Sequence, residues 1–185
     1  MGKVYEGGVD DLLAEWISEQ PVFFVATAPL AADGRVNLSP RGHDCLSVLD
    51  PWRLAWVDYT GSGVETIAHL RENGRITLMW CAFSGPPKIL RVHGRGRVCL
   101  PGTPEYAEVV ARHPEHPSTR AVVVVDVELV SDSCGYGVPL MDLVGERDLL
   151  RRGAERRGPA GLAAYRAERN AESLDGLPGL DPSRA

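Results

Sequence analysis

The chain has 185 residues, a length that suits a single domain able to bury its own core. Its hydrophobic fraction of 44% and charged fraction of 24% are ordinary for a globular protein and exclude disorder of the whole chain. The formal net charge is −5 and no long basic run occurs, so nucleic acid is not expected as a partner.

The first predicted element is a short helix near the amino terminus. Asp10 or Asp11 is placed to cap it, because an acidic side chain there accepts a hydrogen bond from the first free amides of a helix. Pro21 ends it. The residues expected on its apolar side are Leu12, Leu13, Trp16 and Ile17.

A hairpin of two strands follows, at residues 21–30 and 35–42, with Asp33-Gly34 as the turn signal. Pro40 cannot donate a ladder hydrogen bond, so the second strand is expected at a sheet edge or a bulge. Alternation along this strand places three polar side chains on one face: Asn37, Ser39 and Arg41.

The rest of the chain continues as strands with helices inserted between them. Helices are predicted at about 64–72 and 103–112, the second with Thr103 as cap and Pro104 in its first turn. Gly94 and Gly96 indicate a bulge or bend in a long strand. The further predicted strands are 45–49, 52–59, 75–83, 88–100 and 120–133.

This order predicts a mainly β, α+β fold: an antiparallel barrel with covering helices. A parallel sheet would need a helix after nearly every strand. Residues 1–145 are expected to form the barrel domain. Residues 146–185 are polar, helical and then irregular, and are expected to be a helical extension that packs on the barrel or on a partner subunit. The segment from about Asn170 to Pro178 is expected to fold over the binding site, in the same or the partner subunit, because it is an irregular glycine- and proline-containing stretch after a helix.

The location expected from the sequence is the cytoplasm. The amino terminus has no apolar signal core, and no apolar run reaches the length that spans a membrane. Four cysteines are scattered through apolar segments without the Cys-x-x-Cys spacing, which indicates reduced and mostly buried thiols and no metal site.

The turn Gly61-Ser62-Gly63 precedes a predicted helix that carries Thr66 in its first turn. A helix amino terminus presents free N–H groups and partial positive charge, so it can hold a phosphate, with the hydroxyls as further donors. A tight connection without a ligand is the alternative interpretation. Neither the Walker loop nor the full dinucleotide fingerprint is present, so a mononucleotide is the better fit.

Other candidate site residues carry the same two interpretations. Arg41 can bind a phosphate through two parallel hydrogen bonds, or lie on a solvated edge strand. Lys88 and Arg91 can stabilise a reduced flavin, or be ordinary surface charges. His43 follows the polar strand and is a candidate site residue, and Tyr136 between two glycines is a possible stacking platform.

Taken together, these segments resemble the pyridoxamine 5′-phosphate oxidase-like family of FMN-binding split-barrel proteins. The resemblance covers residues 21 to about 130. It is carried by PVFFVATA, DGRVNLSPRG, WVDYTGSGVETIAHLRENGRITLMW and ILRVHGRGRV, in this order and spacing. The carboxy-terminal segments SCGYGVPLMDLVGERDLL and AYRAERNAESLDGLPGL are similar to those of a related FMN-binding subgroup.

The resemblance implies a homodimer with FMN at the subunit interface, acting on a small molecule as an oxidoreductase. It implies that the phosphate is held by the strand of Asn37, Ser39 and Arg41 and by the turn of Ser62, Gly63 and Thr66. The residues that it places along the flavin ring are Val57, Asp58 and Tyr59, with Lys88 or Arg91 tuning the ring.

The sequence departs from the true oxidases in three places. The polar strand is less basic, Gly63 and Val64 follow Ser62 where the oxidases have a basic residue, and no tryptophan follows Trp80. These departures argue against vitamin B6 oxidation, leave flavin binding intact, and admit the deazaflavin F420. The rival class is a non-catalytic flavin or haem carrier, for which His43, His69 or His93 would supply the axial ligand.

Overall fold

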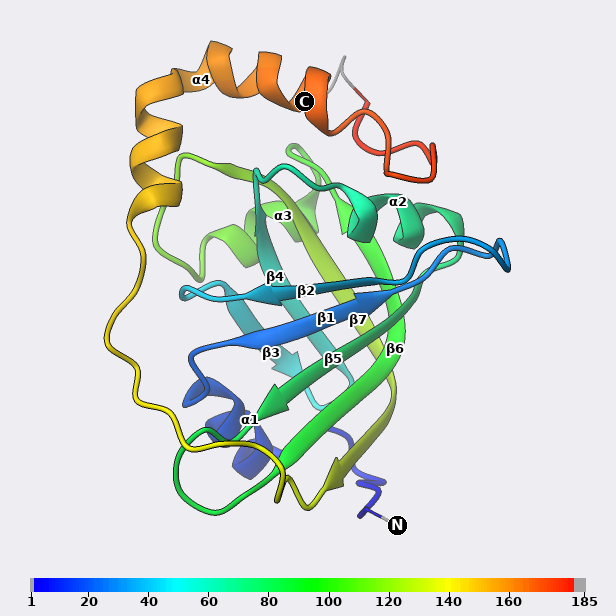
Figure 1. The fold of residues 1–185 in the computed structure, drawn as a ribbon, viewed down its shortest axis with the longest axis vertical. Coiled ribbons are helices and arrows are strands. Elements are labelled where there is room, and N and C mark those ends of the chain that lie inside the picture. Colours follow the sequence, from blue (N-terminus) through cyan, green and yellow to red (C-terminus); the bar gives the residue numbers. More distant parts are fainter. Residues whose placement is uncertain (1, 182–185) are drawn as a thin grey trace.

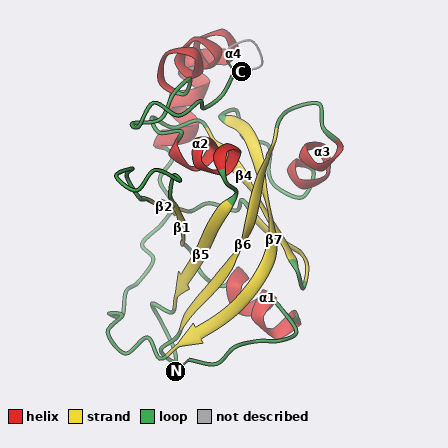
Figure 2. Cartoon of the chain, turned by 90° about the vertical axis from the view of Figure 1, so that its right-hand side faces the viewer, coloured by secondary structure: helices red, strands yellow, loops and turns green. Residues whose placement is uncertain are grey.

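The computed structural model describes residues 2–181 as a curved antiparallel sheet with helices at its two ends (Figures 1 and 2). The strands are β1 (Phe23–Thr27), β2 (Asn37–Arg41), β3 (Leu46–Asp50), β4 (Arg53–Tyr59), β5 (Arg75–Cys81), β6 (Ile89–Cys99) and β7 (Thr119–Ser133). The helices are α1 (Asp11–Ser18), α2 (Glu65–Glu72), α3 (Pro104–Val110) and α4 (Leu149–Arg169).

Within the described residues, the sheet has seven strands in the order β2-β1-β5-β6-β7-β4-β3. All neighbouring strands are antiparallel. The sheet curls into a barrel. The barrel is open between its edge strands, β2 and β3, which follow each other in the chain but do not pair. The predicted antiparallel α+β barrel with covering helices is therefore confirmed.

Local sequence signals account for much of this arrangement. The predicted hairpin is β1 paired with β2, from Phe23 opposite Arg41 to Thr27 opposite Asn37, and Pro40 lies on an edge strand as expected. The ladder between β6 and β7 shifts at His93 and Gly94, where a bulge was predicted. A side chain on residue 94 would place its Cβ 2.2 Å from the carbonyl oxygen of Asp126, so only glycine fits.

The core lies inside the barrel and beneath α1. Trp56, Trp80 and the valines of β7 are buried there. Asp10 caps α1 by accepting a hydrogen bond from the Leu13 amide at 2.8 Å, as predicted. The expectation for Leu12 is wrong: its side chain is 76% exposed, because the core-facing stripe of α1 is narrow and passes through Leu13 and Ile17.

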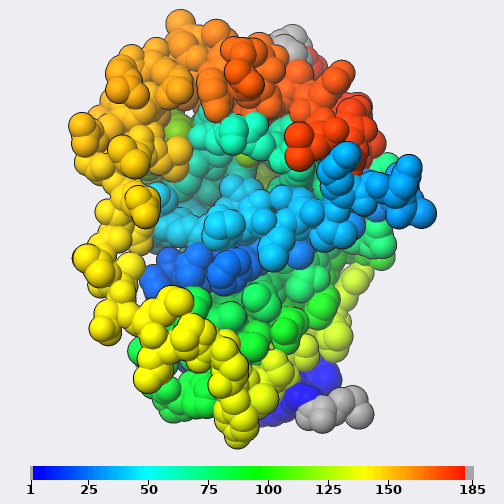
Figure 3. All heavy atoms as spheres, viewed as in Figure 1, coloured from blue at the N-terminus to red at the C-terminus, as the bar shows by residue number. Residues whose placement is uncertain are grey.

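The chain after β7 returns along the outside of the barrel. Residues 134–148, here called the strap, run in extended form from one end to the other, as the yellow trace in Figure 1 shows. Helix α4 then crosses the end that holds α2, with a kink at Gly158-Pro159. Residues 170–181, here called the tail, fold back beside α2 (Figure 3).

Three of the four cysteines are buried and Cys134 is exposed, and all four are free thiols, in agreement with the prediction of mostly buried, reduced cysteines. Among residues 2–181, no helix combines the length and the apolar character needed to cross a bilayer.

Candidate functional site

The polar face of β2 meets the start of α2 in the mouth of the barrel. The Asn37 amide donates to Thr66 Oγ1 at 3.0 Å and to Thr27 Oγ1 at 3.2 Å. Ser39 Oγ donates to Asn37 Oδ1 at 2.9 Å. Arg41 Nη2 lies 3.4 Å from Thr66 Oγ1. The structure therefore brings together four of the residues expected to hold a phosphate: Asn37, Ser39, Arg41 and Thr66.

Helix α2 begins without a side chain that caps its free amides. Its first flanking residue is Val64, which makes no capping hydrogen bond, whereas Asp10 caps α1 and Thr103 caps α3. The acidic residue of its first turn, Glu65, directs Oε1 toward the tail, where it accepts from the Leu174 amide at 3.3 Å. The amides at this helix start lack the intramolecular partner that a cap would supply.

Asp58 lies between two arginines. Arg120 Nε donates to Asp58 Oδ2 at 2.6 Å, and Arg41 Nη1 lies 3.0 Å from Asp58 Oδ1. The side chains of Asp58 and Arg120 are 1% and 2% exposed, and that of Arg41 is 20% exposed. The contact between Arg41 and Asp58 is an ion pair that lacks the alignment of a hydrogen bond. Within residues 2–181, Asp58 Oδ1 therefore has no hydrogen-bond partner.

The arginines in this region outnumber the carboxylates. Arg166 of α4 lies nearby and donates to Thr60 Oγ1 at 2.9 Å and to the Thr119 carbonyl at 3.0 Å. Burial, and then the neighbouring Arg120, lower the pKa of Arg166. Within the described residues, Asp58 is the carboxylate that pairs with Arg41 and Arg120, and no ion pair joins Arg166 to an acid.

Besides Asp58 Oδ1, a second buried atom of this cluster has no hydrogen-bond partner in the described part of the chain. Arg41 Nε is buried, and no hydrogen-bond acceptor among residues 2–181 reaches it. A buried donor of this kind costs free energy unless a ligand or water satisfies it. Excess positive charge, an unpaired guanidinium donor and an uncapped helix start together form a site that suits an anion.

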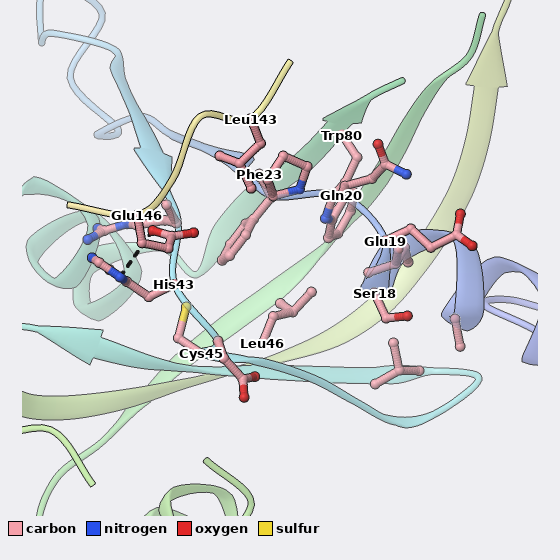
Figure 4. Close-up of a pocket in the computed structure, with 16 residues that line it drawn as sticks. Ser18, Glu19, Gln20, Phe23, His43, Cys45, Leu46, Trp80, Leu143 and Glu146 are labelled. Carbon is pink, nitrogen blue, oxygen red and sulfur yellow. Dashed lines mark ion pairs between the residues drawn. The ribbon is translucent and has the colours of Figure 1, made fainter. Parts of the chain in front are cut away.

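A cavity of about 460 Å³ leads away from Arg41, between the open edges of the barrel and the end of α1 (Figure 4). Phe23 and Trp80 give it an aromatic wall, and their rings stack with centroids 5.8 Å apart. His43 and Glu146 close one side as a pair, with His43 Nδ1 3.3 Å from Glu146 Oε2. Polar side chains lie at both ends of the cavity, Ser18, Glu19 and Gln20 at one and Arg41, His43 and Glu146 at the other. Aromatic walls between polar ends suit a flat organic ligand that carries polar groups.

His43 separates this cavity from a smaller one of about 280 Å³. Its backbone has φ of 66°, a left-handed conformation that is uncommon for a residue other than glycine. Tyr59 and His116 line the smaller cavity, with ring centroids 4.4 Å apart. Burial, the largest cause, raises the pKa of Tyr59 to about 12, so this phenol is a hydrogen-bond donor rather than an anion near neutral pH.

The remaining predicted site residues lie elsewhere. Val57 is buried in the core beside Asp58. Ser62 lines a cavity between the turn and α4, and Gly63 lies against Glu65. Lys88 Nζ lies 4.7 Å from the Trp16 ring centroid, and Arg91 Nη1 donates to Ser133 Oγ at 3.0 Å. Within the described residues, no hydrogen bond or ion pair joins Ser62, Lys88 or Arg91 to Arg41.

Two of the three histidines considered as haem ligands bond to threonines. His69 is 1% exposed, with Nδ1 2.9 Å from Thr27 Oγ1, and His93 Nδ1 lies 3.0 Å from Thr77 Oγ1. His43 is the one of the three that lines a cavity. Tyr136 on the strap is 82% exposed and has no stacking partner among the described residues.

Sequence reasoning missed three residues of the cluster, Thr27, Arg120 and Arg166, and for Asn170 it predicted a segment near the site but not the contacts of its side chain. Arg120 carried a usable signal, because it directly precedes the five apolar residues 121–125, so a charge there enters a buried strand. Asn170 follows a predicted helical run, where asparagine is usually an ordinary helix end. No pattern in the sequence relates it to a turn more than a hundred residues earlier.

Comparison with known proteins places this chain in a family. The family model described as pyridoxamine 5′-phosphate oxidase matches residues 9–134. The chain is 41% identical, over 197 residues, to the pyridoxamine 5′-phosphate oxidase family protein ustO of Aspergillus flavus, an alignment that covers 96% of this chain and 78% of ustO.

Two solved structures share the fold. The crystal structure of a putative pyridoxamine 5′-phosphate oxidase from Lactobacillus delbrueckii has a TM-score of 0.54 at 20% identity, covering 70% of this chain and 98% of that one. The H111A variant of HupZ from Group A Streptococcus has a TM-score of 0.53 at 19% identity, covering 68% and 99%. The fold is thus that of the split barrels, and the chain belongs to the pyridoxamine 5′-phosphate oxidase family.

Proposed function

We propose that this protein binds FMN and acts as an FMN-dependent oxidoreductase on a small molecule. The observation that carries the proposal is the buried Arg41 Nε without a partner, in a cluster with more arginines than carboxylates. A phosphate ester brings the negative charge and the acceptor oxygens that this cluster lacks. The site residues therefore fit the phosphate end of FMN.

Several groups of the chain would hold the phosphate. Arg41, Thr66, Asn37 and Ser39 would supply side-chain donors, and the turn at Ser62 and Gly63 would supply the amides that lead into α2. The cavity next to Arg41 would take the flat ring against Phe23 and Trp80 and exclude water from it. A bound flavin would supply the hydride or electron transfer.

The lining of the ring cavity indicates how the chain would treat a substrate. His43 and Glu146 lie close together at the wall shared by the two cavities, where the imidazole can form a hydrogen bond with a ligand. Tyr59 faces the smaller cavity as a neutral donor. These groups suit a polar small molecule, and they define no specific match to pyridoxamine phosphate.

A homodimer is part of the proposal. Leu38 on β2 is 64% exposed and Val144 on the strap is fully exposed. Further exposed large apolar side chains accompany them, on the residue before β2 and on the strap: Val36, Leu140, Met141 and Leu143. A second copy would cover them and close the cavity that β2 and the strap border. Size-exclusion chromatography with light scattering should give a dimer, and Leu38→Glu together with Leu143→Asp should give a monomer.

The first experiment is a visible spectrum of the purified protein, followed by mass spectrometry of any compound that heat releases. FMN is expected. Arg41→Ala should weaken FMN binding by roughly 100-fold, because hydrogen bonds to charged groups contribute about 1.5–3 kcal/mol each. Arg97→Ala is the matched control, since Arg97 is an exposed strand arginine whose partner is Asp126.

Other outcomes lead to other functions. A protein that binds F420 but not FMN would be a deazaflavin reductase, and a Soret band lost in His43→Ala would identify a haem carrier. If the protein has a flavin spectrum and no combination of reductant and substrate alters it, the protein is a carrier without turnover. A colourless protein that binds none of these cofactors, with equal behaviour of Arg41→Ala and Arg97→Ala, would refute the proposal.

A further inference from the structure

Asn170 of the tail is completely buried, with 0% exposure. Its side chain contacts two places far apart in the sequence. Oδ1 accepts from Arg120 Nη1 at 2.8 Å, and Nδ2 donates to the carbonyl of Gly61 at 3.0 Å. It lies outside residues 9–134, the part that the family model matches. One tail side chain therefore joins the Gly61–Gly63 turn to the arginine cluster.

The contacts continue without a break from the turn to Arg41. Asn170 holds one end of the Arg120 guanidinium, whose Nε donates to Asp58 Oδ2 at 2.6 Å. Asp58 Oδ1 in turn pairs with Arg41 at 3.0 Å. Because Arg120 and Asp58 are almost completely desolvated, neither can exchange its partner for water without a large cost. The orientation of Arg120 therefore limits where Asp58, and through it Arg41, can lie.

Among residues 2–181, Asn170 supplies the hydrogen bond found at the Gly61 carbonyl. Its own backbone is fixed as well, since the Asn170 carbonyl accepts from the Leu180 amide at 2.7 Å. Gly179 packs so closely that a Cβ there would lie 2.4 Å from that carbonyl oxygen and 2.8 Å from Val64. The tail is thus built against the residue that leads into α2.

We propose that Asn170 is a positioning residue of the anion site: it holds the Gly61–Gly63 turn and, through Arg120 and Asp58, sets the orientation of Arg41. The functional half of this inference rests on the proposed FMN site. The structural half states that Asn170 keeps the backbone of the Gly61–Gly63 turn rigid, and this can be tested without a ligand. The competing role is that Asn170 only ends α4, which predicts no effect at the turn.

The test compares Asn170→Ala with Ser173→Ala. Ser173 is a buried polar residue of the same tail that accepts from the Leu177 amide at 3.1 Å and touches neither Arg120 nor Gly61. The first readout is the backbone ¹⁵N order parameter of Gly61 and Gly63, and the second is the dissociation constant of FMN. Asn170→Ala should lower the order parameters from about 0.85 to below about 0.6. It should weaken FMN binding about tenfold, while Ser173→Ala changes neither.

Asn170→Asp separates the contact with Arg120 from the contact with Gly61. It also replaces Asn170→Ala in the test if the alanine variant does not fold. The carboxylate keeps the volume and the acceptor for Arg120 but cannot donate to Gly61, so the turn should loosen as in Asn170→Ala. Equal turn order in wild type, Asn170→Asp and Asn170→Ala would overturn the inference. A wild-type protein that does not bind FMN would refute the proposed function, and the order of the turn would still decide this inference.

Discussion

Two carboxylates of the sheet each lie between two arginines, and their surroundings differ. Asp126 on β7 pairs with Arg97 at 2.6 Å and with Arg53 at 3.6 Å, and its side chain is 54% exposed. Asp58 on β4 pairs with Arg41 and Arg120 and is 1% exposed. Arg53 also pairs with Asp50 at 3.9 Å and solvent screens these charges, so little net charge remains around Asp126. At Asp58 the guanidinium groups outnumber the carboxylate in the barrel mouth, where an anion would offset the excess positive charge.

The largest expected effect comes from removing each of these carboxylates in turn. Asp58→Asn keeps the volume and leaves two buried guanidinium groups without a counter-charge, which should lower the free energy of unfolding by about 3–5 kcal/mol. Asp126→Asn should cost less than about 1 kcal/mol, because its partners are hydrated. Urea denaturation of both variants measures the difference, and equal losses would contradict the contrast between the two regions.

A ligand should restore what the buried cluster lacks. FMN at 100 times its dissociation constant should raise the free energy of unfolding by about 2.7 kcal/mol, because it binds the folded state alone. Asp126→Asn should keep this gain and Arg41→Ala should lose it. The measurement is the thermal midpoint with and without FMN. A gain that survives in Arg41→Ala would place the ligand away from the cluster.

The tail should be sensitive to volume where it meets Val64. Gly179→Ala introduces a Cβ 2.4 Å from a backbone carbonyl oxygen and should lower the free energy of unfolding by about 1–3 kcal/mol, since the backbone must shift. Gly137→Ala on the strap is the control, because no atom lies within 4 Å of its added Cβ. That variant should stay within about 0.5 kcal/mol of wild type. Chemical denaturation checks both, and equal stability would show that the tail is loosely packed.

The smallest expected effect is a pH dependence from His69, a neutral neighbour of the cluster. Burial, the largest cause, lowers its pKa, and Thr27 Oγ1 links it to Asn37. The unfolded chain binds the proton more readily, so stability is highest above about pH 6.5 and falls as the pH drops below it. His69→Gln should reduce this slope.

Urea midpoints of both proteins between pH 7.5 and 5 measure that slope. The midpoint at pH 7.5, where the imidazole is neutral, gives the intrinsic cost of the substitution. Burial also lowers the pKa of His116, which leaves a residual slope of the same sign in the variant. Identical slopes would show that His69 is not the responsible group.

Much of the fold was predictable because its signals are local. The Asp33-Gly34 turn, the alternation in 35–42, the glycines of β6 and the cap at Thr103 each act within a few residues, and each element formed where it was expected. Part of the anion cluster shares this origin, because period-two alternation puts Asn37, Ser39 and Arg41 on one face of a strand. Leu12 shows the limit of local patterns. The apolar spacing of α1 predicts which side faces the core, but it does not predict how many residues on that side are buried.

The sequence by itself determined the strands, the hairpin, the helix after a glycine turn and the polar face of β2, because backbone conformation and side-chain period decide these. Tertiary structure alone decided that β7 lies beside β4, which sets Arg120 against Asp58, and that α4 returns Asn170 to Gly61. It also placed Lys88 over Trp16, away from Arg41. Such pairings depend on strand order and packing, which join residues whose separation along the chain carries no local signal.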